Sequence, residues 1–527
     1  MNSIKHFLNS IILSVLMLAA VSCNDWLQEP SPNLSKLEDY YTGGAAAQEC
    51  VTACYAPLMW EYNSTYFPEW FIGDVVSDDA LKGGQNIGDM AVVYDMENWK
   101  TNTDNQYLLD FYRAQYQGIG RCNLALTIIP DIEKDSMLLQ TKNGVNLQQR
   151  LLGEAHFLRA YYYFRLVRLF GGAPKVDFVI NSSEKWQQPR ASANEIYQFI
   201  LDDLTAAEQS LWQKSDYTAA DTGRVTTGAA QAMLLKVNLY LKNYDQAKKW
   251  GDKLINSHQY ALCADYADNF TLAGENGAES VFEIQYTADP TSDYGEGNGF
   301  TRGAFTQILT RSRSSKLGGG WGFNHPTQNL YNEYEAGDPR RDKTIFDPKD
   351  NMVNQAEEIY LGSPYLNRKT MWIEKDNSIP SLDHASRGPL NNRQIRFADA
   401  LLMYAEACCE AGDLTNAKAA LNQVRARARE GNAEILPDFP YATYSDNQTD
   451  LRRAIRHERR VELAMEGHRW FDLCRWGIAK QTMDAYKATE TPEAQAEMAT
   501  FIEGKHELFP IPSQEIALNP MTQNQGY

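Results

Sequence analysis

The sequence predicts a mainly α-helical fold, in which helical hairpins form a framework and one long region of loops and short strands interrupts them. Apolar residues recur at helical spacing through most of the 527 residues. Two helix pairs far apart in the chain share one layout. The residues between them, 260–392, are dominated by glycine, proline, asparagine and aromatic residues. A loop region of this size on a helical framework is typical of a functional surface.

The first residues have the proportions of a secretory signal peptide. Lys5 precedes an apolar run from Ile11 to Ala20, and small residues lead from there to Cys23. The run is shorter than a membrane-spanning helix requires. We therefore expect residues 1–22 to be an export signal and not part of the folded unit.

The cysteine that ends this segment supports a second inference. Ala20-Val21-Ser22-Cys23 resembles a bacterial lipobox, which implies cleavage before Cys23 and acylation of its thiol and new amino group. Several acyl chains together anchor a protein stably, whereas one alone is marginal. We expect residues 23–38 to be a lipidated tether and residues 39–527 to be a single globular unit.

One helical segment is apolar on nearly all sides. Residues 149–170 carry large apolar and tyrosine side chains around the whole helix, which indicates deep burial. Gly171-Gly172 supplies a stop signal, and Arg165 and Arg168 suit the negative end of the helix dipole. Residues 193–212 form a second, amphipathic helix by the same reasoning.

The two similar helix pairs are predicted to be hairpins. In each, a helix with small residues leads through a short turn into an amphipathic helix with an acid near its start. This is the tetratricopeptide style of hairpin, but the copies are not in tandem, so we expect an interrupted scaffold. Between them, Val281 to Tyr286 is predicted to be a strand. The predicted helices are residues 227–242, 245–257, 394–411 and 414–430.

The charged segment 451–470 resembles an active site in composition but is predicted to be structural. Its apolar residues form one helical stripe. Arg459 and Glu462 are three residues apart, as are Glu466 and Arg469, so each pair can interact along the helix. Further on, Pro510, Pro512 and Pro520 predict an extended tail that lies over the scaffold.

The net charge of −18 argues against two classes of partner. Affinity for nucleic acid and for anionic lipid comes from cationic patches. Neutral sugars and cationic partners remain open, and the acidity can equally serve the solubility of an exported protein. The eight cysteines are scattered without a Cys-x-x-Cys pair. Those that remain after removal of Cys23 are expected to be mostly buried thiols.

Several segments match motifs of one bacterial family, in family order and over nearly the whole chain. They are Leu152–Phe164 with Leu169–Gly172, Gly337–Arg341, Leu402–Ala407, Ile455–Leu463 with Glu466–Gly477, and Leu508–Pro512 with Asn519–Tyr527. On these residues and the lipobox, the chain resembles the SusD/RagB family of Bacteroidetes.

The resemblance implies a SusD-like fold with tetratricopeptide-like hairpins, an N-terminal region of about 39–258 and a loop-rich C-terminal region of about 259–527. It implies a lipoprotein on the extracellular face of the outer membrane. Such a protein captures oligo- or polysaccharide and delivers it to a SusC-like TonB-dependent transporter. The resemblance implies neither an enzyme nor a cofactor. The RagB branch of the family makes capture of peptides the alternative.

A sugar-binding surface needs exposed aromatic rings beside polar side chains. The rings bury the C–H faces of a sugar, while Asp, Asn, Arg and Gln bind its hydroxyls. We expect Trp99 and Trp321 to be such platforms, although a packing role competes for every aromatic residue. The glycine-rich flanks of Trp321 weaken that alternative. The further candidates are Trp70, Tyr286, Tyr294, Asn98, Asn324 and Asp79.

Asp78-Asp79 could contact sugar, cap a helix or bind calcium, and a structural role is favoured. No calcium-loop pattern surrounds the pair. The sequence also lacks Gly-x-Ser-x-Gly, a Walker loop and His-Glu-x-x-His. Ser182-x-x-Lys185 and Ser445-Asp446-Asn447 echo a penicillin-binding set, but no Lys-Thr-Gly follows. A glycosidase needs only two carboxylates at a set separation, so this rival stays open on sequence alone.

Overall fold

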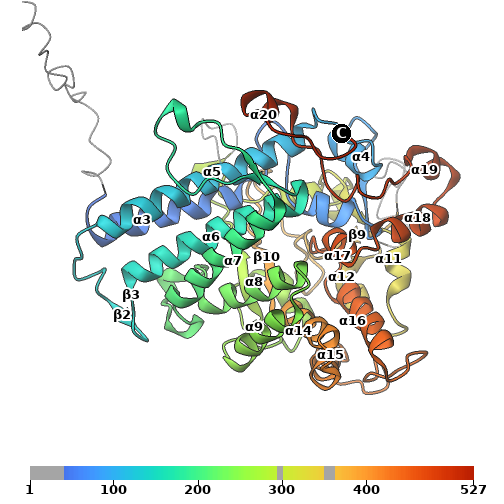
Figure 1. Cartoon of the computed structure of the whole chain (residues 1–527). Helices are drawn as coiled ribbons and strands as arrows, with labels where there is room; N and C mark the ends of the chain where they lie inside the picture. Colours follow the sequence, from blue (N-terminus) through green and yellow to red (C-terminus); the bar gives the residue numbers. More distant parts are fainter. Residues whose placement is uncertain (1–40, 294–300, 349–362) are drawn as a thin grey trace, which may run out of the picture.

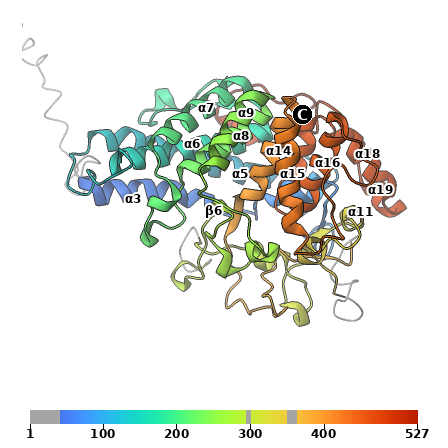
Figure 2. The same ribbon diagram turned by 90° about the horizontal axis from the view of Figure 1, so that it is seen from below.

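The computed structural model describes residues 41–293, 301–348 and 363–527. Helices dominate, as predicted. Figure 2 shows them as a curved layer, with the loops between α9 and α14 gathered on one side of it. In the described residues, no helix combines the length and the apolar character that crossing a bilayer would require.

The helices fall into two groups by length. The longer ones are α3 (Gly43–Tyr55), α5 (Gln106–Ile128), α6 (Leu147–Phe170), α7 (Ala193–Ser210), α8 (Thr227–Tyr240), α9 (Tyr244–Asn256), α14 (Phe397–Glu410), α15 (Leu414–Ala428), α16 (Gln448–Glu462) and α18 (Ala479–Thr489). The shorter ones are the π-helix η3 (Phe71–Val75), α4 (Ala91–Glu97), α10 (Thr306–Thr310), α11 (Gln328–Glu333), α12 (Arg340–Thr344), α17 (Arg469–Trp476), α19 (Pro492–Glu497) and α20 (Ser513–Leu518).

The strands form antiparallel pairs. These are β1 (Ala80–Gly83) with β7 (Phe323–Pro326), β2 (Thr141–Lys142) with β3 (Val145–Asn146), β4 (Ala173–Pro174) with β5 (Arg190–Ala191), β6 (Ser280–Ile284) with β10 (Asn392–Arg396), and β8 (Ile345–Phe346) with β9 (Leu366–Asn367). The strand predicted from Val281 is confirmed as β6, which ends before Tyr286. Because β6 pairs with β10, the start and the end of the loop region are held together.

Helix α6 is the buried centre of the framework in Figure 1. Its N-terminus is closed by a capping box, in which Asn146 and Gln149 each accept the other's backbone N–H at 2.9 Å. Buried side chains on all sides confirm the predicted deep burial. Gly171, with a φ of 69°, follows the last turn. Arg165 and Arg168, expected to serve the helix dipole, both contact Glu69.

The predicted hairpins are confirmed as α8–α9 and α14–α15, and they pack directly on one another. The Tyr404 hydroxyl of α14 donates to Asp252 of α9 at 2.5 Å. The helices approach so closely that a Cβ at Gly251 would lie 2.5 Å from the Tyr404 ring. The scaffold is therefore interrupted in sequence but continuous in space.

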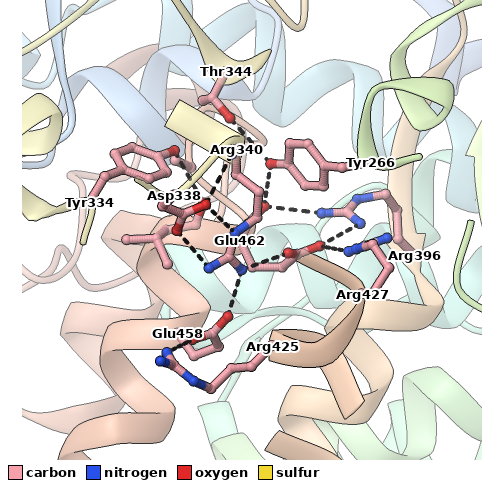
Figure 3. A network of polar contacts seen from close by, with 12 residues as sticks. Tyr266, Tyr334, Asp338, Arg340, Thr344, Arg396, Arg425, Arg427, Glu458 and Glu462 are labelled. Atoms are coloured by element: carbon pink, nitrogen blue, oxygen red, sulfur yellow. Dashed lines mark hydrogen bonds and ion pairs between the residues drawn. The ribbon is translucent and has the colours of Figure 1, made fainter. Parts of the chain in front are cut away.

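A buried charge network, the Glu462 network, joins the loop region to this framework. Glu462 ends α16, and its carboxylate contacts the guanidiniums of Arg340 (3.0 Å), Arg396 (3.1 Å) and Arg427 (Figure 3). These arginines belong to α12, β10 and α15. Burial alone would raise the pKa of Glu462, but the guanidiniums hold that pKa well below its ordinary value.

The same region corrects the predicted pairing within residues 451–470. One helix does not run through the segment, because α16 ends at Glu462 and α17 begins at Arg469. Arg459 contacts Asp399 at 2.9 Å, and Arg469 contacts Asp78 at 2.7 Å. The segment has a structural role, as expected, but Arg459 and Arg469 pair with carboxylates of other segments and not with Glu462 and Glu466 along one helix.

The C-terminal tail lies on the framework, as predicted. The Phe509 N–H donates to the Leu169 carbonyl at 2.7 Å, and Arg190 donates to the Thr522 carbonyl at 2.8 Å. Helix α20 interrupts the tail, which the prolines did not predict. The described cysteines are free thiols, and most are buried, as expected; the buried ones are Cys50, Cys54, Cys122, Cys408 and Cys409.

We expect Glu462→Gln to lower the free energy of unfolding by about 3–5 kcal/mol, because it leaves buried guanidiniums without their counter-charge. Denaturant unfolding followed by circular dichroism measures the effect. Arg453→Ala is the control on the same helix. Its ion pair with Asp450 leaves Arg453 62% exposed, so its loss should change stability by less than about 1 kcal/mol. Equal effects of the two variants would contradict a supporting role for the network.

Candidate functional site

A group of aromatic rings in tilted and edge-to-face contact lies where three segments of the chain meet, and we call Tyr62, Tyr66, Phe305 and Trp321 the aromatic cluster. Tyr66 is central, with its ring 4.7 Å from Tyr62, 5.1 Å from Phe305 and 5.2 Å from Trp321 between centroids. Phe305 is buried, whereas the other three rings are partly exposed. The cluster therefore presents aromatic surface to solvent on a buried aromatic base.

The turn that carries the two tyrosines is anchored to α5. Tyr62 and Tyr66 form an antiparallel bridge. Between them, the backbone N–H groups of Ser64 and Thr65 donate to the Asp110 carboxylate at 3.0 and 2.9 Å. Asp110 is buried in the early turns of α5. Its fixed position holds the turn and the two rings.

Trp321 is positioned by the glycine-rich loop after α10. Its N–H donates to the Ile308 carbonyl at 2.9 Å, and its carbonyl accepts from Arg313 at 3.1 Å. A Cβ at Gly320 would lie 2.4 Å from the Arg311 Cβ, so only glycine lets the loop fold back this closely. The loop thereby places the Trp321 ring against Tyr66.

Polar side chains surround the cluster. Arg313, which holds Trp321, also contacts Asp89 at 3.4 Å. The Thr65 hydroxyl lies 3.8 Å from the Met90 sulfur, so the segment that follows β1 flanks the rings. Exposed amides lie on the same segments, in Asn63, Gln85 and Asn86. The arrangement combines apolar ring faces with hydrogen-bonding groups.

A polar cavity lies next to the cluster, between the loops and the framework. Its volume is about 70 Å³, enough for a few water molecules. The buried Glu61 carboxylate accepts from the Thr306 N–H at 2.8 Å, and the Trp70 indole N–H donates to the Thr306 hydroxyl at 3.0 Å. The Tyr286 hydroxyl lies 3.4 Å from Glu61. Burial raises the pKa of Glu61.

The structure separates the predicted aromatic residues into different roles. Trp321 is in the cluster and partly exposed, and Tyr286 is partly exposed but directed at Glu61. Trp70 and Trp99 are buried, at 4% and 6% exposure. Trp99 packs edge-on against Phe501 at 5.3 Å. The expectation that Trp99 is an open platform is therefore corrected, because the C-terminal segment covers its ring.

The predicted polar residues are also buried, which corrects their assignment to an open surface. Asn98 donates to the Tyr94 carbonyl at 2.9 Å, and Asp79 contacts Arg460 at 2.8 Å. Asn324 is fully buried and donates to Asp74 at 3.3 Å. Tyr294 and Cys23 lie outside the described residues.

Three rings of the cluster, those of Tyr62, Tyr66 and Phe305, were not among the residues predicted from the sequence. A signal was present, since Tyr62 and Tyr66 flank Asn63-Ser64-Thr65, a run of turn-forming residues that suits a tight hairpin. In the described part of the chain, no group of three or more His, Cys, Asp or Glu side chains is placed to hold a metal ion.

Two family models match the chain. The model of the SusD family matches residues 278–527, and a model described as starch-binding associating with outer membrane matches residues 26–239. The chain belongs to the SusD family. The resemblance inferred from the motifs is thereby confirmed.

Relatives and solved structures agree with this assignment. SusD-like protein P2 of Formosa agariphila is 26% identical, over 98% of this chain and 99% of its own. A laminarin binding SusD-like protein is 28% identical with a TM-score of 0.77. Surface glycan-binding protein A from Bacteroides fluxus is 26% identical with a TM-score of 0.77. Both alignments cover 92% of this chain and 100% of the other, which confirms the SusD-like fold.

Beside the site of this SusD-like protein, Asp74 should make stability depend on pH. Burial raises the pKa of Asp74 from 3.8 to about 7, although Gly467 and Asn324 donate hydrogen bonds to it. Between about pH 4 and pH 7 the folded state therefore holds a proton that the unfolded state has lost. This group's contribution to stability falls as pH rises through that window.

Asp74→Asn removes this titration. The stability of the variant relative to wild type should rise by up to about 1.4 kcal/mol per pH unit between pH 4 and pH 7, then level off. Denaturant unfolding at a series of pH values measures the difference. The Asn324 side-chain oxygen has no hydrogen-bond partner, so that amide can turn to accept from the new side chain. A difference that is independent of pH would contradict the prediction.

Proposed function

We propose that this protein binds oligo- or polysaccharide at the aromatic cluster and does not transform it. The observation that carries the proposal is the partly exposed Tyr62–Tyr66–Trp321 surface with amides beside it. Sugar rings bury their C–H faces on such surfaces, and their hydroxyls reach the surrounding amides. The printed descriptions of two structural relatives, as laminarin binding and as surface glycan-binding, support the same class of ligand.

The acids nearest the rings favour binding over hydrolysis. Asp110 is buried and accepts backbone N–H groups, and Asp89 is paired with Arg313. Glu61 is buried beneath the loops with Thr306 as its donor. A glycosidase needs an acid and a second carboxylate on either side of the scissile bond. These three acids hold the loops in place.

Trp321→Ala should weaken the binding of a neutral glycan by about 1–3 kcal/mol, because it removes the apolar surface of one stacked ring. Isothermal titration calorimetry with laminarin, followed by a panel of neutral polysaccharides and peptides, measures the loss. Trp250→Ala is the matched control, since Trp250 is a partly exposed tryptophan on α9 in the scaffold. Unchanged affinity in folded Trp321→Ala protein would remove the cluster from the binding site.

We also propose that the protein is held on the extracellular face of the outer membrane by lipid on Cys23, and that it passes glycan to a SusC-like TonB-dependent transporter. The lipobox resemblance and the family membership support this arrangement. Co-purification of a transporter of this type with the tagged protein from native membranes would test the partnership.

Cys23→Ala should abolish lipid attachment, because the thiol that receives the lipid is lost. The expected result is loss of metabolic labelling by a radioactive fatty acid and absence from the membrane fraction. Cys263→Ala, a substitution at a partly buried thiol, should keep both. Lipid labelling that persists in Cys23→Ala protein would contradict the proposed anchor.

A further inference from the structure

A second hollow, with a volume of about 600 Å³, is lined by residues of α16 and α18. Figure 2 shows these two helices in the C-terminal part of the helical layer. We call this cavity the α16–α18 hollow. Its size falls in the range of small-ligand sites. Part of its lining comes from the charged family motif, which sugar binding at the aromatic cluster does not use. The lining residues that matter here are Tyr444, Arg453, Arg456, Trp476, Gln481 and Thr482.

Two arginines in the wall lie over aromatic rings. Arg453 and Arg456 are three residues apart on α16, so they occupy one face of the helix. The Arg456 guanidinium lies over the Trp476 ring at 4.8 Å, and that of Arg453 lies over Tyr444 at 5.3 Å. A guanidinium stacked on a ring keeps the N–H groups at its edge available for a planar or multi-oxygen anion.

Arg456 is a cation without a counter-charge. Within the described parts of the chain it has no carboxylate in ion-pairing range, although both neighbours, Arg452 and Arg453, have one. Its buried Nε lacks an acceptor. Burial lowers the pKa of Arg456 despite nearby acids. A partly buried cation in this state is stabilised by an oxyanion that binds its terminal N–H groups.

The other cations that line the hollow already have partners. Arg460 and Arg469 contact Asp78 at 2.9 and 2.7 Å, and His457 contacts Glu333 at 2.8 Å. These charges neutralise one another at the floor of the hollow. An anion that enters the hollow therefore meets Arg456, which lacks a carboxylate partner, and the exposed Arg453, which also contacts Asp450.

We propose that the α16–α18 hollow binds a sugar residue that carries a carboxylate or a sulfate group. Arg456 and Arg453 bind the anionic group, and Gln481 and Thr482 of α18 face the sugar hydroxyls. The proposal rests on the proposed function, because the ligand is a glycan, and it adds an acidic class of sugar. In a chain of net charge −18, a local site of this kind is needed to hold an anion against the general repulsion.

The hollow and the aromatic cluster lie at opposite ends of the β1–β7 ribbon. At the hollow end, the Thr327 hydroxyl donates to the Asp78 carbonyl at 2.7 Å. At the cluster end, the Gly84 N–H donates to the Gly322 carbonyl at 2.5 Å. Strand β1 lies between these two contacts, and a strand of its length spans about 10 Å. The two sites are therefore distinct and can be tested separately.

The test is calorimetry of the full chain with three probes: a short oligogalacturonate, a short sulfated carrageenan oligosaccharide and a neutral laminarin oligosaccharide. Arg456→Ala and Arg453→Ala should each weaken binding of an acidic probe by about 10- to 100-fold, the loss expected for a charge-assisted contact. The two acidic probes distinguish carboxylate from sulfate. Neither variant should change binding of the neutral probe, and the acidic contact should weaken as salt is raised.

Two further variants guard against misfolding and general charge effects. Ala485→Glu adds a carboxylate at an exposed α18 position in the hollow without touching either stacked arginine, and it should also weaken acidic binding. Arg113→Ala, which removes an arginine on distant α5, should not. Acidic binding that survives all three hollow variants, or that Trp321→Ala alone abolishes, overturns this inference and leaves the proposed function standing. Binding of the neutral probe without binding of either acidic probe also overturns this inference alone. If no glycan binds, both this inference and the proposed function are overturned.

Discussion

The convergence of Arg340, Arg396 and Arg427 on the buried Glu462 carboxylate is the constraint on which the rest of the structure depends. The three arginines arrive from α12, β10 and α15, so the network ties the loop region to the helical framework at one point. Buried charges are costly to desolvate and tolerate only well-paired geometry. The loops can therefore present surface residues without becoming detached from the helices.

The surface chemistry follows from this attachment. The aromatic cluster takes rings from the turn before η3, from the start of α10 and from the glycine-rich loop. The glycine-rich loop follows α10 closely, whereas the tyrosine turn lies far earlier in the chain. Asp110 of α5 fixes the tyrosine turn, and the backbone of α10 fixes Trp321. A rigid support of this kind lowers the ordering cost of binding a flexible sugar chain.

The fold could largely be predicted from the sequence, because the patterns that indicate helices are local. The hairpin helices 227–242 and 394–411 show small and apolar residues at helical spacing, and the structure places helices there. The direct packing of α9 on α14 could not be predicted, because it depends on how the loop region between the two hairpins folds. The end of α16 at Glu462 was also missed, since a buried network overrides the helical pattern of residues 451–470.

The site was harder to predict from the sequence than the fold, because a local sequence pattern does not determine whether a side chain is exposed. Trp99 and Trp321 were both expected to be platforms, yet Phe501 covers Trp99 and a glycine-rich turn leaves Trp321 partly open. Asn324 follows Trp321 closely but points into the interior toward Asp74. Flanking glycines were the informative signal for Trp321, as they indicated a loop that folds back without burying its ring.

The most direct test of glycan binding at the aromatic cluster is a crystal structure of this protein with a laminarin oligosaccharide, or with an oligosaccharide of any neutral polymer that binds. We predict a sugar ring stacked on Trp321 or Tyr66, with its hydroxyls reaching the amides of Asn63 or Asn86. An oligosaccharide that is well ordered elsewhere on the molecule, with these rings bare, would contradict it.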